Sequence, residues 1–331
     1  MKVLITGGTG FLGQRLAARI KQIGYDVTVT GRNETVGMSL VQNGFRFVRA
    51  DLRDPDQMKQ AIEGTDYVFH CGALSAPWGH YQDFYAINVG GTENVINSCL
   101  DHSVRRLIHI SSPSIYFEYR NKLHVKEADP LPRKMVNYYA QTKYLAEQRI
   151  DAAFTAGLPV ITIRPRAIFG PGDTTIFPRF IIANQRLGIP LVDNGQVLTD
   201  VTYIDNVVDA LVLSIDSAPG TLGKKYNISN GNPVPFQELL QKLLSKLGLE
   251  LRTRPIPFSA AYFGVFFLET FYKYLLPGQE PPLTCYSLGT ISKSLTLDIT
   301  AAKNELGFEP KIGIDEGIDL FVNWWKETNQ Q

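Results

Sequence analysis

Tyr139 and Lys143 stand four residues apart in a stretch whose pattern predicts a helix over Asn137–Ala156. On a helix this spacing places both side chains on one face, one turn apart. A tyrosine with an ordinary pKa near ~10 exchanges protons poorly at neutral pH, but a neighbouring ammonium favours the phenolate and lowers that pKa. The pair therefore predicts general acid/base chemistry. Tyr138 does not fit the pattern, because Thr142 stands four residues after it.

A second group of polar side chains follows a predicted strand, Arg106–Ser111. Ser112 and Ser114 come directly after it, separated by a proline. Hydroxyls at this point can face the crevice beyond the carboxyl ends of parallel strands, where ligands bind in open α/β sheets. Serines at strand ends also form turns. Together with the Tyr/Lys pair, the cluster predicts a substrate-binding role.

The segment Lys2–Gly13 has the order of an apolar strand, a glycine turn and a helix start. Gly7 permits the tight turn, Gly10 lets the backbone approach a pyrophosphate, and Gly13 lets helix and strand pack closely. The N–H groups and positive dipole end of the helix then face the phosphates. The predicted dinucleotide contacts in this loop are Gly7, Thr9, Gly10, Phe11, Leu12 and Gly13.

The end of the second predicted strand, Asp26–Thr30, indicates which nicotinamide cofactor binds. In NAD-binding loops an acidic residue about 20 residues after the glycines bonds the adenosine ribose. This chain has no acid there, and Arg32 can instead bind a 2′-phosphate through a charge-assisted fork. NADP(H) is therefore preferred, with NAD(H) as the alternative. Asp51 and Leu52, at the end of the third strand, are predicted to lie at the adenine.

Alternating strands and helices position these groups. The predicted strands are Val3–Thr6, Asp26–Thr30, Phe45–Ala50, Tyr67–Cys71, Arg106–Ser111 and Val160–Arg164. The predicted helices between them are Phe11–Ile23, Asp56–Glu63, Tyr81–Asp101 and Asn137–Ala156. This βαβ order predicts an α/β protein with a Rossmann-type, doubly wound parallel sheet. We expect residues 1–169 to form the NADP-binding core, with segments around 200–230 returning to it.

Residues 170–331 are expected to form most of a smaller, C-terminal substrate-binding cap. Helices are predicted there over Ile204–Ser217, Pro235–Leu247 and Ile314–Glu327. The segment Phe258–Leu276 is rich in aromatic residues and carries only two charges. We interpret it as a buried or lid helix. Contact with a membrane surface or an apolar substrate is the alternative, and a membrane span is not expected because of its charged pair.

Composition excludes several classes of protein. The chain has 331 residues, of which 44% are hydrophobic and 20% charged, and its net charge is +1. Near-neutrality argues against a nucleic-acid partner, which requires a strongly basic face. The three cysteines are widely spaced without a CxxC pair. They predict neither a disulfide framework nor a metal site, and they favour a cytoplasmic location, peripheral to a membrane if Phe258–Leu276 contacts one.

Several motifs occur in the order typical of one superfamily. They are the glycine loop, NVxGTxN over Asn88–Asn94, the Ser112 strand end, YxxxK, and Arg164–Gly172. The chain resembles the extended short-chain dehydrogenase/reductases. Four further segments resemble the 3β-hydroxysteroid dehydrogenase branch, most closely the bacterial 2-alkyl-3-oxoalkanoate reductases of olefin biosynthesis. These are Ala76–Gly79, Thr202–Asn206, Ile228–Gly231 and Glu280–Pro282.

The resemblance implies roles for individual residues. Tyr139 would be the general acid/base, Lys143 would hold the cofactor ribose, and Ser112, four residues before Tyr116, would bond the substrate oxygen. Ser114 is the alternative to Ser112. The other implied cofactor contacts are Cys71, Gly72, Ala73, Asn88, Ser111, Arg164, Pro165 and Ile168, with Asn88 supporting the architecture of the site. Trp78 and Tyr116 are the further substrate contacts, although Trp78 could equally belong to the core.

The resemblance therefore implies an NAD(P)-dependent oxidoreductase that interconverts a ketone and a secondary alcohol. The aromatic segment suits an apolar substrate, either a 3-oxoacyl or a steroid-like molecule. A nucleotide-sugar epimerase is the alternative. The residues 194–200 carry no basic residue for a diphosphate, which speaks against it. A regulatory nicotinamide-binding protein would not need the Tyr/Lys pair. Tyr81–Asp101 and Asn137–Ala156 are the faces expected for a homodimer.

Overall fold

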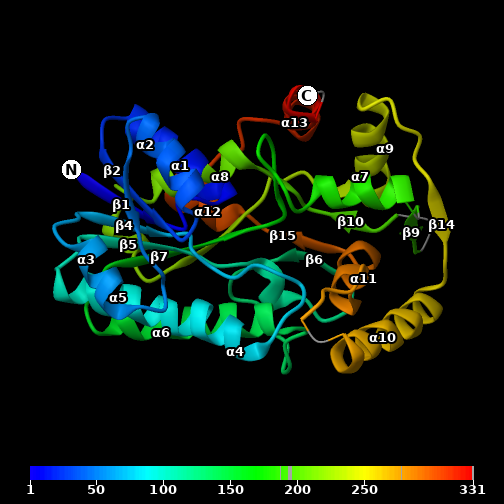
Figure 1. Ribbon diagram of the computed structural model, residues 1–331, viewed down its shortest axis with the longest axis horizontal. Coiled ribbons are helices and arrows are strands. Elements are labelled where there is room, and N and C mark those ends of the chain that lie inside the picture. Colours follow the sequence, from blue (N-terminus) through cyan, green and yellow to red (C-terminus); the bar gives the residue numbers. More distant parts are fainter. Residues whose placement is uncertain (187, 193–195, 277, 330–331) are drawn as a thin grey trace.

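A seven-stranded sheet forms the centre of the protein (Figure 1). The computed structural model describes residues 1–331 except 187, 193–195, 277 and 330–331. The strands follow the order β12-β7-β5-β4-β1-β2-β3, and all neighbours are parallel. They are β1 (Lys2–Thr6), β2 (Asp26–Gly31), β3 (Arg46–Arg49), β4 (Tyr67–His70), β5 (Arg106–Ile110), β7 (Val160–Pro165) and β12 (Lys225–Ile228). The doubly wound, Rossmann-type sheet is confirmed, and β12 comes from the returning segment.

Helices cover both faces of this sheet because its strands are apolar on both faces. In β1, Val3 and Ile5 join the core cluster that contains α1, whereas Leu4 joins the cluster that contains α3. Successive side chains of a strand point to opposite faces, which explains the division. The first face is covered by α1 (Phe11–Gln22), α8 (Ile204–Leu213) and α12 (Thr300–Leu306). The second is covered by α3 (Pro55–Ile62), α5 (Gly91–Asp101) and α6 (Tyr138–Thr155).

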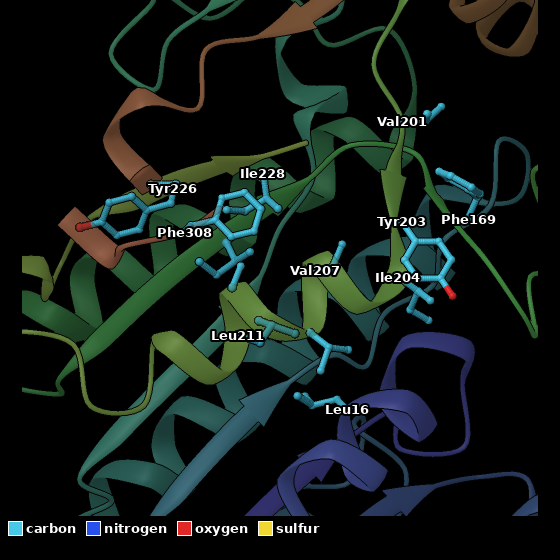
Figure 2. Close-up of a cluster of buried hydrophobic side chains, with 14 of the residues drawn as sticks. Leu16, Phe169, Val201, Tyr203, Ile204, Val207, Leu211, Tyr226, Ile228 and Phe308 are labelled. Atoms are coloured by element: carbon cyan, nitrogen blue, oxygen red, sulfur yellow. The ribbon is translucent and has the colours of Figure 1, made fainter. Parts of the chain in front are cut away.

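The larger core cluster continues from the sheet into the C-terminal part of the chain. Figure 2 shows Leu16 of α1 near Leu211 of α8, and Phe308 beside Tyr226 and Ile228 of β12. Each large apolar side chain that is fully buried contributes about 1.5–3 kcal/mol to stability. This shared core holds the segments after Pro165 firmly against the sheet. Between β2 and β3 lies one further helix, α2 (Glu34–Gln42), which the sequence analysis did not identify.

The cap contains three small sheets and five helices among the described residues. A four-stranded sheet has the order β13-β10-β15-β6, and two-stranded sheets pair β8 with β11 and β9 with β14. Their strands are β6 (Lys122–Val125), β8 (Ile168–Phe169), β9 (Ile189–Leu191), β10 (Leu198–Thr199), β11 (Thr202–Tyr203), β13 (Val234–Pro235), β14 (Thr253–Pro255) and β15 (Leu295–Leu297). The helices are α7 (Phe177–Arg186), α9 (Phe236–Lys246), α10 (Phe258–Leu275), α11 (Cys285–Ser292) and α13 (Ile314–Asn329). Strand β6 belongs to the N-terminal half of the chain but pairs with β15 of the cap.

The predicted helical stretch Tyr81–Asp101 is confirmed as helical throughout, but its middle is π-helical rather than α-helical. The structure has α4 (Tyr81–Phe84), then a π-helical segment η1 (Tyr85–Gly90), and then α5. A π-helical turn inserts extra backbone into a helix, often at functional sites. Directly after this segment the packing is close, because a Cβ at Gly91 would stand 2.8 Å from the Leu52 Cβ. Short 3₁₀ helices, η2 (Pro113–Tyr116) and η4 (Pro219–Thr221), complete the regular structure.

Helix α10 is not a core helix, which corrects one of the interpretations of Phe258–Leu276. Val265 is its one buried residue, and α10 packs against α11 at the edge of the cap (Figure 1). Its large exposed side chains are Phe263, Phe266, Phe267, Phe271, Tyr274 and Leu275. Among the described residues no helix is both long and apolar enough to cross a bilayer.

Candidate active site

Helix α6 brings Tyr139 and Lys143 to the carboxyl end of the central strand β5. Asn137 caps the helix by accepting a 2.8 Å hydrogen bond from the Ala140 N–H. Lys143 is buried, and its Nζ donates to the Ile110 carbonyl oxygen at 2.6 Å. Tyr139 is half-buried one turn earlier. The two residues lie on the same face of α6, at the end of the sheet.

Burial changes the proton affinity of Lys143. Desolvation lowers its pKa from 10.5 to about 8, while the Glu147 carboxylate and the Cys71 thiol act in the opposite direction. An ammonium group has three donors, and one bond to Ile110 leaves two for a ligand. Lys143 can therefore both bind hydroxyl groups and change its protonation near neutral pH.

The serines after β5 fall into two kinds. Ser112 is half-buried and caps η2, because its Oγ accepts a 3.2 Å bond from the Ser114 N–H. Among the described residues no group accepts the Ser112 hydroxyl proton, which leaves it free to donate. The hydroxyls of Ser111 and Ser114 are buried without a hydrogen-bond partner among the described residues. Buried hydroxyls normally find partners, so these two atoms are unusual polar groups of the site, and a ligand contact of Ser111 or Ser114 stays a prediction.

The glycine loop has the geometry of a phosphate cradle. Gly7 adopts φ +64, and a Cβ there would stand 2.7 Å from the Gly72 backbone. A Cβ at Gly13 would stand 2.3 Å from the Gly7 carbonyl oxygen, so the helix packs directly on the turn. At Gly10 the one neighbour within 4 Å is that same oxygen, at 3.2 Å. The outer side of Gly10 is therefore open for a pyrophosphate.

The first turn of α1 supports the same fit to a dinucleotide. Gly10 is its N-cap residue and offers no side chain to the helix N–H groups. No acidic side chain occupies the first turn, so nothing there opposes an anion. Phe11 packs toward Gly172, and Thr9 packs against Gly31 at the end of β2. Leu12 is half-buried against the core.

The residues predicted at the adenosine end lie near one another. Arg32 is exposed after β2 and forms no ion pair among the described residues. Its positive charge helps to lower the pKa of Asp51, although the main cause is the side-chain hydrogen bond from Arg53. Asp51 thus already binds Arg53, at 2.6 Å. Leu52 packs against Gly72 and Gly91, between the adenosine end and the glycine loop.

Asn88 connects the loop after β4 to α6. Its Oδ1 accepts from the Leu74 N–H at 2.7 Å, and its amide donates to the Leu74 carbonyl at 3.1 Å and to Thr142 Oγ1 at 3.0 Å. The side chain therefore binds protein rather than a ligand. In this loop Cys71 and Gly72 are half-buried, and Ala73 is exposed. Burial raises the pKa of the Cys71 thiol to about 12, which keeps it protonated.

Tyr116 and Arg164, for which ligand contacts were expected, belong to a closed polar network, and those contacts stay a prediction. Arg164 Nε and Nη2 bind the two Glu147 carboxylate oxygens at 2.8 and 2.5 Å. The Tyr116 hydroxyl bonds the Arg164 guanidinium and donates to Asn227 Oδ1 at 3.0 Å. Burial alone would lower the pKa of Arg164, but the bonds to Glu147 and Tyr116 raise it. We call this set of four residues the Arg164 network.

Arg166 is a polar residue at the site that the sequence analysis did not identify. It follows Pro165, is 9% exposed, and its Nε has no hydrogen-bond partner among the described residues. Ile168 is half-buried and pairs with Thr202. The sequence shows both Arg164 and Arg166. It does not indicate that Arg164 forms an ion pair with Glu147 while Arg166 forms none among the described residues.

Trp78 lies in the loop between β4 and α4 and is half-buried. It packs against none of the core clusters formed by the described residues, which favours the loop over the core alternative. Residues 194 and 195, part of the segment used to argue against an epimerase, lie outside the described residues. In the described part of the chain no three His, Cys, Asp or Glu side chains are placed to hold a metal ion.

Comparisons with known proteins agree with this geometry. A match to the 3-beta hydroxysteroid dehydrogenase/isomerase family covers residues 4–258. A 2-alkyl-3-oxoalkanoate reductase of Stenotrophomonas maltophilia (strain K279a) is 36% identical, over 96% of this chain and 97% of the relative. A mouse (Mus musculus) sterol-4-alpha-carboxylate 3-dehydrogenase, decarboxylating, is 31% identical, over 97% and 90%. The structure of UDP-glucuronic acid 4-epimerase from Bacillus cereus in complex with NAD is 20% identical, with TM-score 0.79 over 99% and 100% of the chains, and shares the fold.

Proposed function

The chain belongs to the 3-beta hydroxysteroid dehydrogenase/isomerase family and is an oxidoreductase of the extended short-chain dehydrogenase/reductase superfamily. From this premise we propose that it interconverts a ketone and a secondary alcohol on an apolar, lipid-like substrate. The observation that carries the proposal is the position of Lys143, buried beside the end of β5 and one turn from Tyr139. The proposed substrate class is taken from the names of its reductase and dehydrogenase relatives.

Each residue of the site has a separate role in the proposed reaction. When bound, the nicotinamide cofactor supplies or accepts a hydride. In the reductive direction Tyr139 Oη donates a proton to the substrate oxygen, and Lys143 stabilises the phenolate that remains. Ser112, with Ser114 as the alternative, donates a hydrogen bond to the same oxygen and stabilises the developing negative charge. The two free Lys143 donors suit the hydroxyls of a ribose.

We also propose that NADP(H) is the preferred cofactor. Arg32 is exposed at the end of β2 and forms no ion pair in the described part of the chain, so its guanidinium is available to a 2′-phosphate. Replacing Arg32 by Ser is expected to weaken NADPH about 10-fold or more and to leave NADH unchanged, because charged hydrogen bonds contribute roughly 1.5–3 kcal/mol. Steady-state KM values for both cofactors measure this change, and equal losses for both would contradict it.

The decisive test of the proposed reaction uses two adjacent tyrosines. Tyr139→Phe is expected to lower kcat by about 10²–10⁴, the range for loss of a general acid. Tyr138→Phe is the matched control, because Tyr138 is exposed. NADPH oxidation is followed with 2-alkyl-3-oxoacids, 3-oxosteroids and simple ketones. Full turnover by Tyr139→Phe would overturn the assignment, and UDP-sugar binding without net cofactor oxidation would favour the epimerase alternative.

The exposed face of α10 suggests a second property, contact with a lipid surface. Glu269, the one acid on this helix, turns inward and accepts a 2.8 Å bond from the Cys285 N–H. The outer face thus presents aromatic side chains with Lys273 and no acid, a composition typical of interfacial helices on anionic membranes. Co-sedimentation with anionic vesicles should fall for Phe263→Ser/Phe267→Ser, and undiminished binding would contradict the proposal. The homodimer through α4–α6 stays a prediction.

A further inference from the structure

His70 is a buried histidine to which the proposed reaction assigns no role. It ends β4, in register with Thr6 of β1 on one side and with His109 of β5 on the other. Its Nδ1 lies 2.8 Å from Thr6 Oγ1, and its Nε2 lies 2.9 Å from Thr92 Oγ1 of α5. The ring centroid of His109 is 5.4 Å away, but both of its nitrogens are buried without a partner among the described residues. Of these two neighbouring rings, only His70 is held by side chains on both sides.

The bonds around His70 determine which ring nitrogen carries the proton. The Thr92 hydroxyl donates to the Asn88 carbonyl oxygen at 2.6 Å, so its oxygen accepts from the ring and Nε2 carries the proton. At the other nitrogen, Thr6 Oγ1 accepts a bond from the Gly72 N–H at 3.2 Å. Its own proton is therefore directed at the bare Nδ1. All four bonds run in one direction, from Gly72 to Asn88, and we call them the His70 chain.

The His70 chain connects segments that are predicted to contact the cofactor. At one end Gly72 lies against the glycine loop, because a Cβ at Gly7 would stand 2.7 Å from its backbone. At the other end the Asn88 side chain binds both the N–H and the carbonyl of Leu74, at 2.7 and 3.1 Å. The loop after β4 is thus fixed at two points by one set of bonds, and the exposed Ala73 lies between them.

His70 keeps this arrangement at physiological pH because its ring stays neutral. Burial lowers the pKa of His70 to about 3, and the positive charge of Lys143 acts in the same direction. Burial also lowers the pKa of His109, which lies beside the ring. A proton on Nδ1 would compete with the Thr6 hydroxyl for the same bond and reverse that end of the chain. The neutral ring therefore fits both threonines at once.

We propose that His70 is a positioning residue for the nicotinamide cofactor. Through Thr6 and Thr92 it holds the loop after β4 against the glycine loop, so that the cofactor binds to a surface that is already ordered. An ordered site loses less conformational entropy when its ligand binds, which increases affinity. The inference rests on the proposed function, because it takes both loops as contacts of the cofactor.

The first measurement concerns the ring itself and needs no cofactor. The chain has five histidines, so the ¹⁵N signals of His70 in the labelled protein are identified by their loss in His70→Gln. We expect a proton on Nε2, none on Nδ1, and no titration between about pH 6 and 8, where an ordinary histidine changes its charge. A proton on Nδ1, or titration in this range, would overturn the inference.

The second measurement is the affinity for NADPH and for NADH, followed by calorimetry. His70→Phe keeps a ring and removes both nitrogens, and it is expected to weaken both cofactors about 10-fold, the scale of a lost buried hydrogen bond. The losses should be equal, because the His70 chain does not include Arg32. His70→Gln, whose amide offers an acceptor and a donor, should retain part of the affinity.

The matched control is His109→Phe, the same change in the neighbouring ring that has no partner among the described residues. It should change either affinity by less than about 2-fold, since no bond to a side chain is lost. Equal losses in the two Phe variants would show that any change in this part of the sheet weakens binding, and would overturn the role of His70.

A pair of smaller substitutions tests whether the bonds act together. Thr6→Val and Thr92→Val each remove one hydroxyl from opposite sides of the ring. If His70 joins them into one unit, the double variant should lose less affinity than the product of the two single losses. Losses that multiply in full would mean that the threonines act separately, which contradicts the proposal. These variants decide if His70→Phe fails to fold.

The two proposals fail in different ways. If ketones are reduced but His70→Phe binds both cofactors as the wild type does, the inference on His70 fails and the proposed function stands. If both cofactors bind and depend on His70 but no ketone is reduced, the proposed function fails and the positioning role stands. If the wild type binds neither cofactor, both are overturned.

Discussion

Two buried arginines, two residues apart at the end of β7, occupy opposite environments. Arg164 lies in the Arg164 network, where Glu147 binds it through both carboxylate oxygens and Tyr116 and Asn227 complete the bonds. Arg166 is almost as buried, but its guanidinium has no such partner in the described structure. The hydrogen-bond donors of the Arg164 guanidinium bind Glu147 and Tyr116 of the protein itself.

The difference teaches that burial alone does not separate structural from functional charges. Successive residues of an extended chain point to opposite sides, but residues two apart share a side only while the strand continues. Strand β7 ends at Pro165, so Arg166 lies beyond it, within electrostatic reach of Tyr286 and Asp200. Arg164 is held by the protein's own side chains, whereas Arg166 has no comparable partner among the described residues.

The largest expected effect comes from opening the Arg164 network. Glu147→Gln removes one negative charge and leaves the Arg164 guanidinium buried without a counterion. Breaking a buried pair in this way typically costs about 3–5 kcal/mol. We expect a loss of this size in the free energy of unfolding, measured by urea denaturation followed by circular dichroism.

The control for this prediction is an exposed pair of the same chemistry. Glu280→Gln breaks the ion pair with Arg179, in which both side chains are about half exposed. Exposed pairs contribute about 1 kcal/mol or less. Equal losses in the two variants would show that the Arg164 network is not a closed structural unit.

The next effect concerns Lys143, a buried cation that can release its proton. Its pKa is about 8 in the folded protein against an ordinary 10.5. Between these values the unfolded chain holds a proton that the folded protein has lost, so the free energy of unfolding rises with pH across the window from 8 to 10.5. Each pKa unit is worth about 1.4 kcal/mol, which makes the total on the order of 3 kcal/mol.

Lys143→Met should lack this contribution. The measurement is the difference in unfolding free energy between wild type and variant at several pH values from 7.5 to 10, so that the ionisation of the tyrosines cancels. The difference should shift in favour of the wild type as the pH rises. A pH-independent difference would show that Lys143 stays charged and has a counterion, as Arg164 has.

The smallest effect on stability is expected at Arg166. Because its guanidinium makes no hydrogen bond in the described structure, Arg166→Met removes a desolvated charge and keeps the apolar stem. The free energy of unfolding should change by about 1 kcal/mol or less, or increase, as when apolar residues replace buried charges. A loss comparable to that in Glu147→Gln would assign Arg166 a structural role.

The sequence predicts the central sheet well because the signals there are local. Six strands show continuous apolar runs, and each lies in the sheet at the predicted place. Strand β12 has the sequence Lys-Tyr-Asn-Ile, whose mixed polarity gives no such run. It is a strand because Asn227 and Tyr226 find partners far away in the chain. Local pattern carries no information about those partners.

The site was predictable in part for the same reason. Tyr139, Lys143 and the glycine loop carry short motifs, and the structure places them at one end of the sheet. Glu147 was missed, although it follows Lys143 by one helical turn and is an acid on the buried face of α6. The roles of Tyr116 and Arg164 depend on pairing across β7 and α6. These contacts join residues that the fold brings together, and the spacing of the residues along the sequence does not predict them.

The π-helical turn at Tyr85–Gly90 contains Asn88. We expect the position of Asn88 to depend on how many residues this turn contains rather than on which residues they are. Asn88 lies within this turn and bonds both Leu74 and Thr142, and a π-helical turn contains more residues than an α-helical turn. Deleting the exposed Tyr85 would turn the flanking helices by about 100° relative to each other, the angle of one α-helical residue. Tyr85→Ala would leave Asn88 in place. The position of Asn88 is therefore expected to depend on the number of residues in this turn and not on the identity of the exposed ones.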